Sequence, residues 1–206
     1  MARVGNWEKR AARPKIGAVV PSLEKKFMNE SLQRLTARTI FYPTLAWNIL
    51  HGRVLRRRNW WDSIDSQIIL GALPFARDVP AMAELGVRGV VNTCEEYAGP
   101  IKAYARFGIE QYHMPTIDFT HPKFQDVCQA VEFIEQHAAR SQSIYIHCKA
   151  GRARSATVAM CWLIKSQQIS AAEAQNWLLE KRPHVNAKLA FRPVVREFEK
   201  KFRQDP

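Results

Sequence analysis

The chain has few cysteines, and none of them stands in a paired pattern. Its 206 residues contain four, which are Cys94, Cys128, Cys148 and Cys161. This usage argues against a disulfide scaffold and favours a reducing compartment. No cluster of His, Cys, Asp and Glu with the spacing of metal ligands is visible either. We therefore expect neither a metal nor another cofactor.

The chain also lacks a long hydrophobic run. Its apolar stretch at residues 35–50 is interrupted by Pro43 and Asn48 and falls far short of the roughly 20 residues that a spanning helix needs. A basic cluster of Arg53 and residues 56–58 follows, and then the pair Trp60-Trp61. Aromatic residues beside such a cluster are typical of a membrane interface, where each arginine contributes about 1 kcal/mol against anionic lipid. The alternative, compatible with the first, is a helix packed on the remaining domain with an exposed basic turn.

Acidic residues are scarce in the first part of the chain. Residues 1–60 contain 13 Lys and Arg but 3 Asp and Glu, whereas the other 146 residues contain 18 and 16. We divide the chain into a flexible basic arm (1–35), an apolar and basic membrane-interface helix (36–60) and one catalytic domain (61–206). The basic residues Arg3, Lys9, Arg10, Arg13 and Lys15 are compatible with a mitochondrial targeting segment, although Ser is absent before Ser22. No base-reading module follows the arm, so we do not expect a nucleic-acid partner.

From residue 61 onward, short apolar runs alternate with helical patterns. Strands are expected at 66–70, 88–93, 109–113 and 143–147. Helices are expected near 78–86, 97–107, 124–134, 156–165, 170–178 and 191–202, and Ser170 with Glu173 predicts a capping box. This alternation predicts an α/β fold with a largely parallel central sheet flanked by helices and a ligand at the carboxyl ends of the strands.

The segment His147-Cys148-Lys149-Ala150-Gly151-Arg152-Ala153-Arg154-Ser155 lies between an apolar strand and a helix that is apolar on all sides. Loop amides and the positive end of the helix would favour a bound phosphate group. They would also favour a thiolate, since helix N-termini and cationic neighbours lower the pKa of cysteine from about 8.5 to roughly 3.5–7.5. We therefore expect Cys148 to be a nucleophile at neutral pH.

The other residues of this segment have complementary roles. Arg154 can bind two phosphate oxygens with its planar fork. We expect Ser155 to hydrogen-bond the sulfur, Gly151 to let the backbone approach the ligand, and His147 to hold the loop by donating to its carbonyls. Two further positive charges, at Lys149 and Arg152, suit a multiply anionic headgroup, although they could also serve acidic peptides.

A phosphoryl transfer needs a general acid to protonate the leaving oxygen. Asp118 stands in a proline-rich loop thirty residues ahead of Cys148. Two neighbours, Asp126 and His121, are alternatives for this role.

The pattern His-Cys-x-x-Gly-x-x-Arg resembles the signature of the cysteine-dependent phosphatases. This resemblance implies that Cys148 attacks phosphorus, that Arg154 and the amides of residues 149–154 (Lys149, Ala150, Gly151, Arg152, Ala153, Arg154) bind the phosphoryl oxygens, and that water hydrolyses a phosphocysteine intermediate. It also supports Asp118 as the acid, because relatives carry theirs at that distance. The fold that it implies is the dual-specificity type.

A wider set of segments is similar to the mitochondrial PTP-like lipid phosphatase family. The resemblance runs from about Thr36 to the last helix, and its segments are Phe41-Tyr42-Pro43-Thr44, Trp60-Trp61-Asp62, Leu70-Gly71-Ala72-Leu73-Pro74, Gly89-Val90-Val91 and Glu95-Glu96-Tyr97. It implies hydrolysis of phosphatidylglycerophosphate to phosphatidylglycerol on the route to cardiolipin, with an anionic phospholipid and a membrane surface as partners. Members also occur in plants and some bacteria, so the location implied is the mitochondrial inner membrane in a eukaryote or the cytoplasmic face of a bacterial membrane.

Several alternatives stay open at this point. The protein could be a dual-specificity phosphatase of protein tyrosine, serine and threonine, a phosphoinositide phosphatase, or a silent phosphate-binding module. The pattern does not decide whether Glu95 and Glu96 order the pocket or are solvated. Cys94 occupies a place comparable to that of a cysteine in the tumour-suppressor phosphoinositide 3-phosphatase, and this resemblance suggests that it forms a reversible disulfide with Cys148.

Overall fold

The protein is built around a mixed sheet. The computed structural model describes residues 20–203, and for residues 20–30 and 33 it describes the backbone alone. The strands are β1 (Trp61–Ser63), β2 (Ile68–Gly71), β3 (Val87–Cys94), β4 (Glu110–Thr116) and β5 (Ser143–His147), in the order β1-β2-β5-β3-β4. All neighbouring pairs are parallel except β1 with β2. The expected largely parallel sheet is therefore confirmed, and the antiparallel edge strand β1 is an addition to it.

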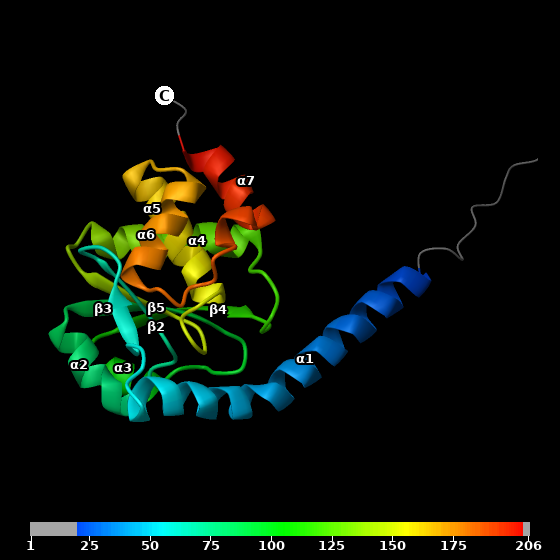
Figure 1. Ribbon diagram of the computed structural model, residues 1–206, viewed down its shortest axis with the longest axis horizontal. Coiled ribbons are helices and arrows are strands. Elements are labelled where there is room, and N and C mark those ends of the chain that lie inside the picture. Colours follow the sequence, from blue (N-terminus) through cyan, green and yellow to red (C-terminus); the bar gives the residue numbers. More distant parts are fainter. Residues whose placement is uncertain (1–19, 204–206) are drawn as a thin grey trace, which may run out of the picture.

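The helices lie on both sides of this sheet (Figure 1). They are α1 (Val20–Ile49), α2 (Val79–Glu84), α3 (Ile101–Arg106), α4 (Phe124–Ala138), α5 (Arg154–Gln167), α6 (Ala171–Lys181) and α7 (Pro193–Phe202), with short turns η1 (Leu50–Val54), η2 (Ala76–Asp78) and η3 (Leu189–Phe191). The capping box at α6 is confirmed, because Ser170 Oγ accepts the Glu173 N–H at 3.2 Å and the Glu173 carboxylate accepts the Ser170 N–H at 2.8 Å. The helix expected at 97–107 begins only at Ile101, so Tyr97 belongs to a loop.

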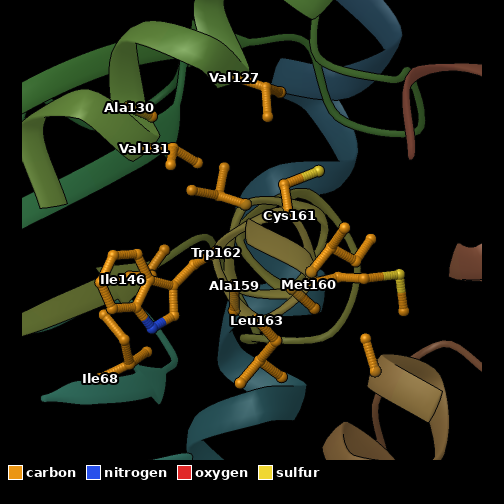
Figure 2. Packing of buried hydrophobic residues seen from close by; sticks show 14 of the residues in the cluster. Ile68, Val127, Ala130, Val131, Ile146, Ala159, Met160, Cys161, Trp162 and Leu163 are labelled. Atoms are coloured by element: carbon orange, nitrogen blue, oxygen red, sulfur yellow. The ribbon is translucent and has the colours of Figure 1, made fainter. Parts of the chain in front are cut away.

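Alternation along β5 explains why the sheet is covered on both faces. Ile144 and Ile146 point into a large core with α4 to α7, whereas Tyr145 points into a smaller core with α2 and α3. Figure 2 shows the large core around α5, where Cys161 and Trp162 face side chains of α4 and of the strands. Burial of each such large apolar side chain stabilises the fold by about 1.5–3 kcal/mol. The core therefore fixes α5, and with it the loop that precedes α5.

The long helix α1 corrects the predicted division of the first sixty residues. It begins at Val20 and runs through Pro43 to Ile49, so the boundary expected at residue 35 does not separate a flexible arm from a helix. Its first turns project away from the body (Figure 1). The basic residues expected in a targeting segment, from Arg3 to Lys15, lie outside the described residues. Among the helices that the structure describes, none combines the length and apolarity needed to cross a bilayer.

One face of α1 packs on the catalytic domain, as the second of the two interpretations of this segment predicted. Ala37, Phe41 and Asn48 are buried. The opposite side is exposed and apolar, and we call it the α1 apolar face; it comprises Leu32, Leu35, Ile40, Tyr42 and Trp47 of α1 with Leu50, the first residue of η1. Because one side of α1 packs on the domain while the other side stays exposed, the interpretation of α1 as a membrane-interface helix is still open.

Two residues expected at that interface are instead part of the fold. Trp60 is buried, and its Nε1 donates to the Leu73 carbonyl at 3.1 Å. The Arg53 guanidinium lies over the Trp60 ring, 4.2 Å from its centroid, and is paired with Asp78. Both side chains are therefore engaged by the domain, whereas the sequence suggested that they meet the membrane.

Candidate active site

The segment 147–155 lies at the carboxyl end of β5, between the ends of β2 and β3. The loop 148–153, which we call the cradle loop, connects β5 to the first residue of α5, Arg154. Gly151 has a φ of 65°, and a Cβ there would lie 2.5 Å from the Gly71 carbonyl oxygen. Glycine is therefore required because the loop passes close to the backbone of β2 in a left-handed conformation, a reason additional to the expected approach of a ligand.

Cys148 lies at the base of this loop and is 4 % exposed. Burial alone would raise the pKa of its thiol, but Arg154 and hydrogen bonds from the Ser155 hydroxyl and backbone amides lower the pKa to about 7. The Ser155 hydroxyl donates to Cys148 Sγ at 3.3 Å. The site therefore holds a substantial fraction of thiolate at neutral pH.

This pKa predicts how fast Cys148 reacts with an alkylating agent. The rate of its modification by iodoacetamide should rise with pH through a midpoint near 7, because the thiolate is the reactive form. In Ser155→Ala the midpoint should move to higher pH, since a donor that stabilises the thiolate is lost. Mass spectrometry of the Cys148 peptide measures this rate separately from that of Cys128. An unchanged midpoint in Ser155→Ala would contradict the role of the hydroxyl.

Arg154 is buried and placed to bind a phosphoryl group. Its Nη1 donates to Glu96 Oε2 at 2.9 Å and to the Thr116 carbonyl at 2.7 Å. Its Nη2 lies 3.2 Å from Asp118 Oδ1 but makes no hydrogen bond. Burial by itself would lower the pKa of Arg154, yet the surrounding thiols and carboxylates raise it. The guanidinium is therefore charged and has one amino group ready for a ligand oxygen.

Glu96 is the residue that orients this arginine. Besides the bond to Arg154, its Oε1 accepts the backbone N–H of Asp118 at 3.2 Å, so it joins the two expected catalytic side chains. The sequence left its role open, and its place two residues after the end of β3 was the available signal. Its neighbour Glu95 instead meets Arg34 of α1 at 3.4 Å. The structure thus separates the two adjacent glutamates into an internal and a peripheral one.

Glu96→Gln should lower kcat about 10- to 100-fold, because a charged hydrogen bond that is worth roughly 1.5–3 kcal/mol and fixes Arg154 is weakened. Glu95→Gln is the matched control and should change kcat less than about twofold. Rates on a soluble aryl phosphate and the unfolding temperature are measured for both. Equal losses in the two variants, or a loss in Glu96→Gln that follows unfolding, would contradict a positioning role.

Of the three candidates for the general acid, Asp118 is the one paired with the cradle among the described residues. It forms ion pairs with Lys149 and with Arg154. Asp126 and His121 line a separate hollow of about 250 Å³ next to Arg34 and Lys123 of the same region. The structure therefore brings Asp118, of these three candidates, against the cradle loop and Arg154.

The remaining segment residues occupy different surroundings. Lys149 is buried between the rings of Phe41 and Phe119, each centred 5.5 Å from its Nζ. Arg152 is exposed, and its Nε donates to the His184 carbonyl at 2.8 Å, on the outer side of the loop. Burial lowers the pKa of His147 to about 3, although a backbone contact at Cys148 acts in the opposite direction. His147 is therefore neutral and fully buried, but neither ring nitrogen has a hydrogen-bond partner in the described part of the chain, so the expected donation to the loop carbonyls is not observed.

Residues after α6 hold the cradle loop, and no motif in the sequence pointed to them. Arg182 Nε donates to the Gly151 carbonyl at 3.0 Å, the Asn186 N–H to the Arg152 carbonyl at 2.9 Å, and Arg192 Nη1 to the Ala153 carbonyl at 3.2 Å. Arg182 is also paired with Asp62 of β1. Because three successive carbonyls are bound from outside, the loop amides are left for the thiolate and a ligand.

Cys94 ends β3 and is fully buried. Burial raises the pKa of its thiol strongly, and the nearby Cys148 contributes in the same direction. The two cysteines are therefore electrostatic neighbours, although their pairing stays a prediction.

The sheet, the cradle loop and the buried arginine define a cysteine-dependent phosphatase. A family model described as dual specificity phosphatase, catalytic domain, matches residues 68–201.

Phosphatidylglycerophosphate phosphatase PTPMT2 of Arabidopsis thaliana is 38% identical over 164 residues, which cover 78% of this chain and 72% of the relative. Phosphatidylglycerophosphatase and protein-tyrosine phosphatase 1 of Mus musculus is 35% identical over 173 residues, covering 80% and 90%. The crystal structure of PTPMT1 in complex with PI(5)P has a TM-score of 0.64 at 30% identity and covers 70% of this chain and 97% of its own. The chain belongs to the dual specificity phosphatase family, in the group of these phosphatidylglycerophosphate phosphatases.

Proposed function

We propose that the protein hydrolyses the phosphomonoester of phosphatidylglycerophosphate and releases phosphatidylglycerol and phosphate. The names of relatives that are 35–38% identical over most of the chain support this substrate. The buried Lys149 adds positive charge beside Arg154, which suits a multiply anionic headgroup. The product is a phosphodiester, and the route that consumes it would lead to cardiolipin.

The proposed reaction has two steps. The Cys148 thiolate attacks phosphorus in line, the bond from phosphorus to the glycerol oxygen breaks, and Asp118 gives its proton to that oxygen. Arg154 and the loop amides of residues 149–154 stabilise the three equatorial oxygens. Water then attacks the phosphocysteine, loses its proton to Asp118 and regenerates the thiolate. Phosphate binding would compete with Asp118 for Lys149 and Arg154, which frees the acid for its task.

The observation that carries a membrane substrate is the position of α1, whose buried side contacts the cradle loop and whose opposite side is the α1 apolar face. Phe41, on the buried side of the same helix, contacts Lys149 of the cradle. Tyr42 and Trp47 are 73% and 61% exposed on the opposite side. Aromatic side chains of this kind favour the headgroup region of a bilayer. We therefore infer membrane association, at the mitochondrial inner membrane in a eukaryote or the cytoplasmic face of a bacterial membrane.

A substrate panel tests the proposal. Phosphate release by the full chain is measured from phosphatidylglycerophosphate in mixed micelles, from a phosphotyrosine peptide and from phosphoinositides, with Cys148→Ser as the blank. The phosphoinositides are included because a solved neighbour binds PI(5)P. A preference of about a hundredfold or more for phosphatidylglycerophosphate is expected. Equal or faster turnover of the peptide would instead indicate a protein phosphatase.

We also propose that Cys94 protects the nucleophile from over-oxidation. Peroxide would convert the Cys148 thiolate to a sulfenic acid, and the Cys94 thiol would attack that sulfur, displace water and form a disulfide that dithiothreitol reduces. After peroxide treatment, dithiothreitol should restore most of the activity of the natural protein but little of that of Cys94→Ser. Cys161→Ser, which replaces another fully buried cysteine, is the control. Equal recovery in Cys94→Ser would overturn the proposal.

A further inference from the structure

A second basic hollow lies on the outer side of the cradle loop. It has a volume of about 500 Å³, and its lining residues are Arg56, Arg57, Arg58, Asn59, Asp62, Lys181, Pro183 and His184. Four of these side chains are cationic, and Arg152 joins them through its bond to the His184 carbonyl. We call this region the outer basic hollow. None of its lining residues belongs to the cradle loop, and Arg152 is the cradle residue that lies beside it.

Carboxylates of the described residues compensate the positive charge of the outer basic hollow only in part, since Lys181 is paired with Glu180 at 3.5 Å. Its one lining carboxylate, Asp62, is already paired with Arg182. Within residues 20–203, Arg56, Arg57 and Arg58 form no ion pair with a carboxylate. Burial, and then the charges of Arg152 and Arg182, lower the pKa of Arg58. Guanidinium groups that repel one another in this way favour a bound anion.

Two further features fit a built site rather than a solvated charged surface. His184 Nε2 is buried without a hydrogen-bond partner in the described part of the chain. Burial, with the charges of Arg182 and Arg58, lowers the pKa of His184 to about 4, so the ring is neutral and can still donate one hydrogen bond. Arg56 has a φ of 49°, a conformation that costs energy for a residue with a side chain. The strained turn presents three consecutive arginines towards the hollow.

The apolar residues that precede the three arginines indicate the source of the anion. Val54 and Leu55 come directly before Arg56 in the chain, are 65% and 45% exposed, and follow the exposed Leu50; we call these two residues the apolar rim. An anion that lies among arginines while its apolar part lies along this rim has the chemistry of a phospholipid. A free phosphate ion would make no use of the rim.

We propose that the outer basic hollow binds the phosphate group of an anionic phospholipid as a second site, distinct from the cradle. The proposal rests on the proposed function only in assuming that the protein works at an anionic membrane. The bound group is a phosphodiester, which Cys148 does not face and does not cleave. A lipid held there keeps the cradle at the membrane while substrates enter and leave.

Binding of a soluble phospholipid with the cradle already occupied tests this site. The full chain is saturated with tungstate, a tetrahedral oxyanion that fills the cradle, and titrated calorimetrically with monomeric dihexanoyl phosphatidylglycerol. We expect one lipid to bind per chain. Arg57→Gln/Lys181→Gln should weaken that binding at least tenfold. The matched control Arg140→Gln/Lys200→Gln, which removes two exposed cations elsewhere, should weaken it less than about twofold.

Three results would overturn the proposal. Loss of lipid binding when tungstate is present would make the cradle the site, and equal weakening in the two double variants would reduce the effect to net charge. Competition by inorganic phosphate at concentrations similar to those of the lipid would identify a free phosphate as the occupant. Each of these results leaves the substrate preference untouched, so failure of the second site is distinguishable from failure of the proposed reaction.

Discussion

Cys148→Ser should lower kcat/KM on every phosphomonoester by roughly 10⁴-fold or more. A serine hydroxyl is not ionised by Arg154 and the loop amides, which lower the pKa of the thiol to about 7. The donors that bind phosphate stay in place, so affinity for the substrate should be retained. Phosphate release measures the first effect, and equilibrium binding of radiolabelled substrate measures the second.

Cys128→Ser is the matched control for this loss. Cys128 lies on α4, is partly exposed and packs against the large core rather than the cradle. Its replacement should leave the rate within about twofold. If Cys148→Ser kept more than a few per cent of the activity, the phosphocysteine mechanism would be wrong and a directly activated water would be required.

Asp118→Asn should lower kcat about 10²- to 10⁴-fold on a substrate with a poor leaving group, such as an alkyl phosphate. The amide cannot donate a proton to the glycerol oxygen, whereas it preserves the shape of the side chain that contacts Lys149 and Arg154. On para-nitrophenyl phosphate, whose leaving group departs without protonation, the loss should be much smaller. This difference between substrates is the readout that a structural role would not produce.

Asp126→Asn provides the comparison for this position. It removes a carboxylate from the neighbouring hollow and should leave both substrates nearly unaffected. An unaltered rate in Asp118→Asn would transfer the role to Asp126 or His121. Equal losses on the two substrates would show that Asp118 acts by orienting Arg154 instead of giving a proton.

The sequence predicted the elements that carry strong local patterns. The apolar run at β5 and the apolar helix α5 were recognised because their side chains are buried on every side, and Ser170 with Glu173 located the start of α6. β1 was missed because its three residues are too few to show an alternation of apolar and polar side chains. The ring of Trp61 was also interpreted as part of a membrane interface. The continuity of α1 across residue 35 was missed because basic and apolar residues alternate there without a clear period.

The sequence predicted those site residues that are close together in the chain. It did not predict those that folding brings together from distant segments. Cys148 and Arg154 are six residues apart, at the start of the cradle loop and at the first residue of α5, so their association is local. Glu96 reaches Arg154 from 58 residues away, and Arg182 reaches Gly151 from 31 residues away. Such contacts depend on the order of the strands and on the packing of α6. A short sequence motif contains no information on either.

The outside support of the cradle loop has a consequence for the order of events during synthesis. The carbonyls of residues 151–153 are bound by Arg182, Asn186 and Arg192, all of which leave the ribosome well after the nucleophile. A nascent chain that has exposed Cys148 but not yet these residues has no means of turning its loop amides inward. The thiol therefore keeps an ordinary, less reactive character until the last helices dock, so the competence to break phosphate esters arrives at the end of translation.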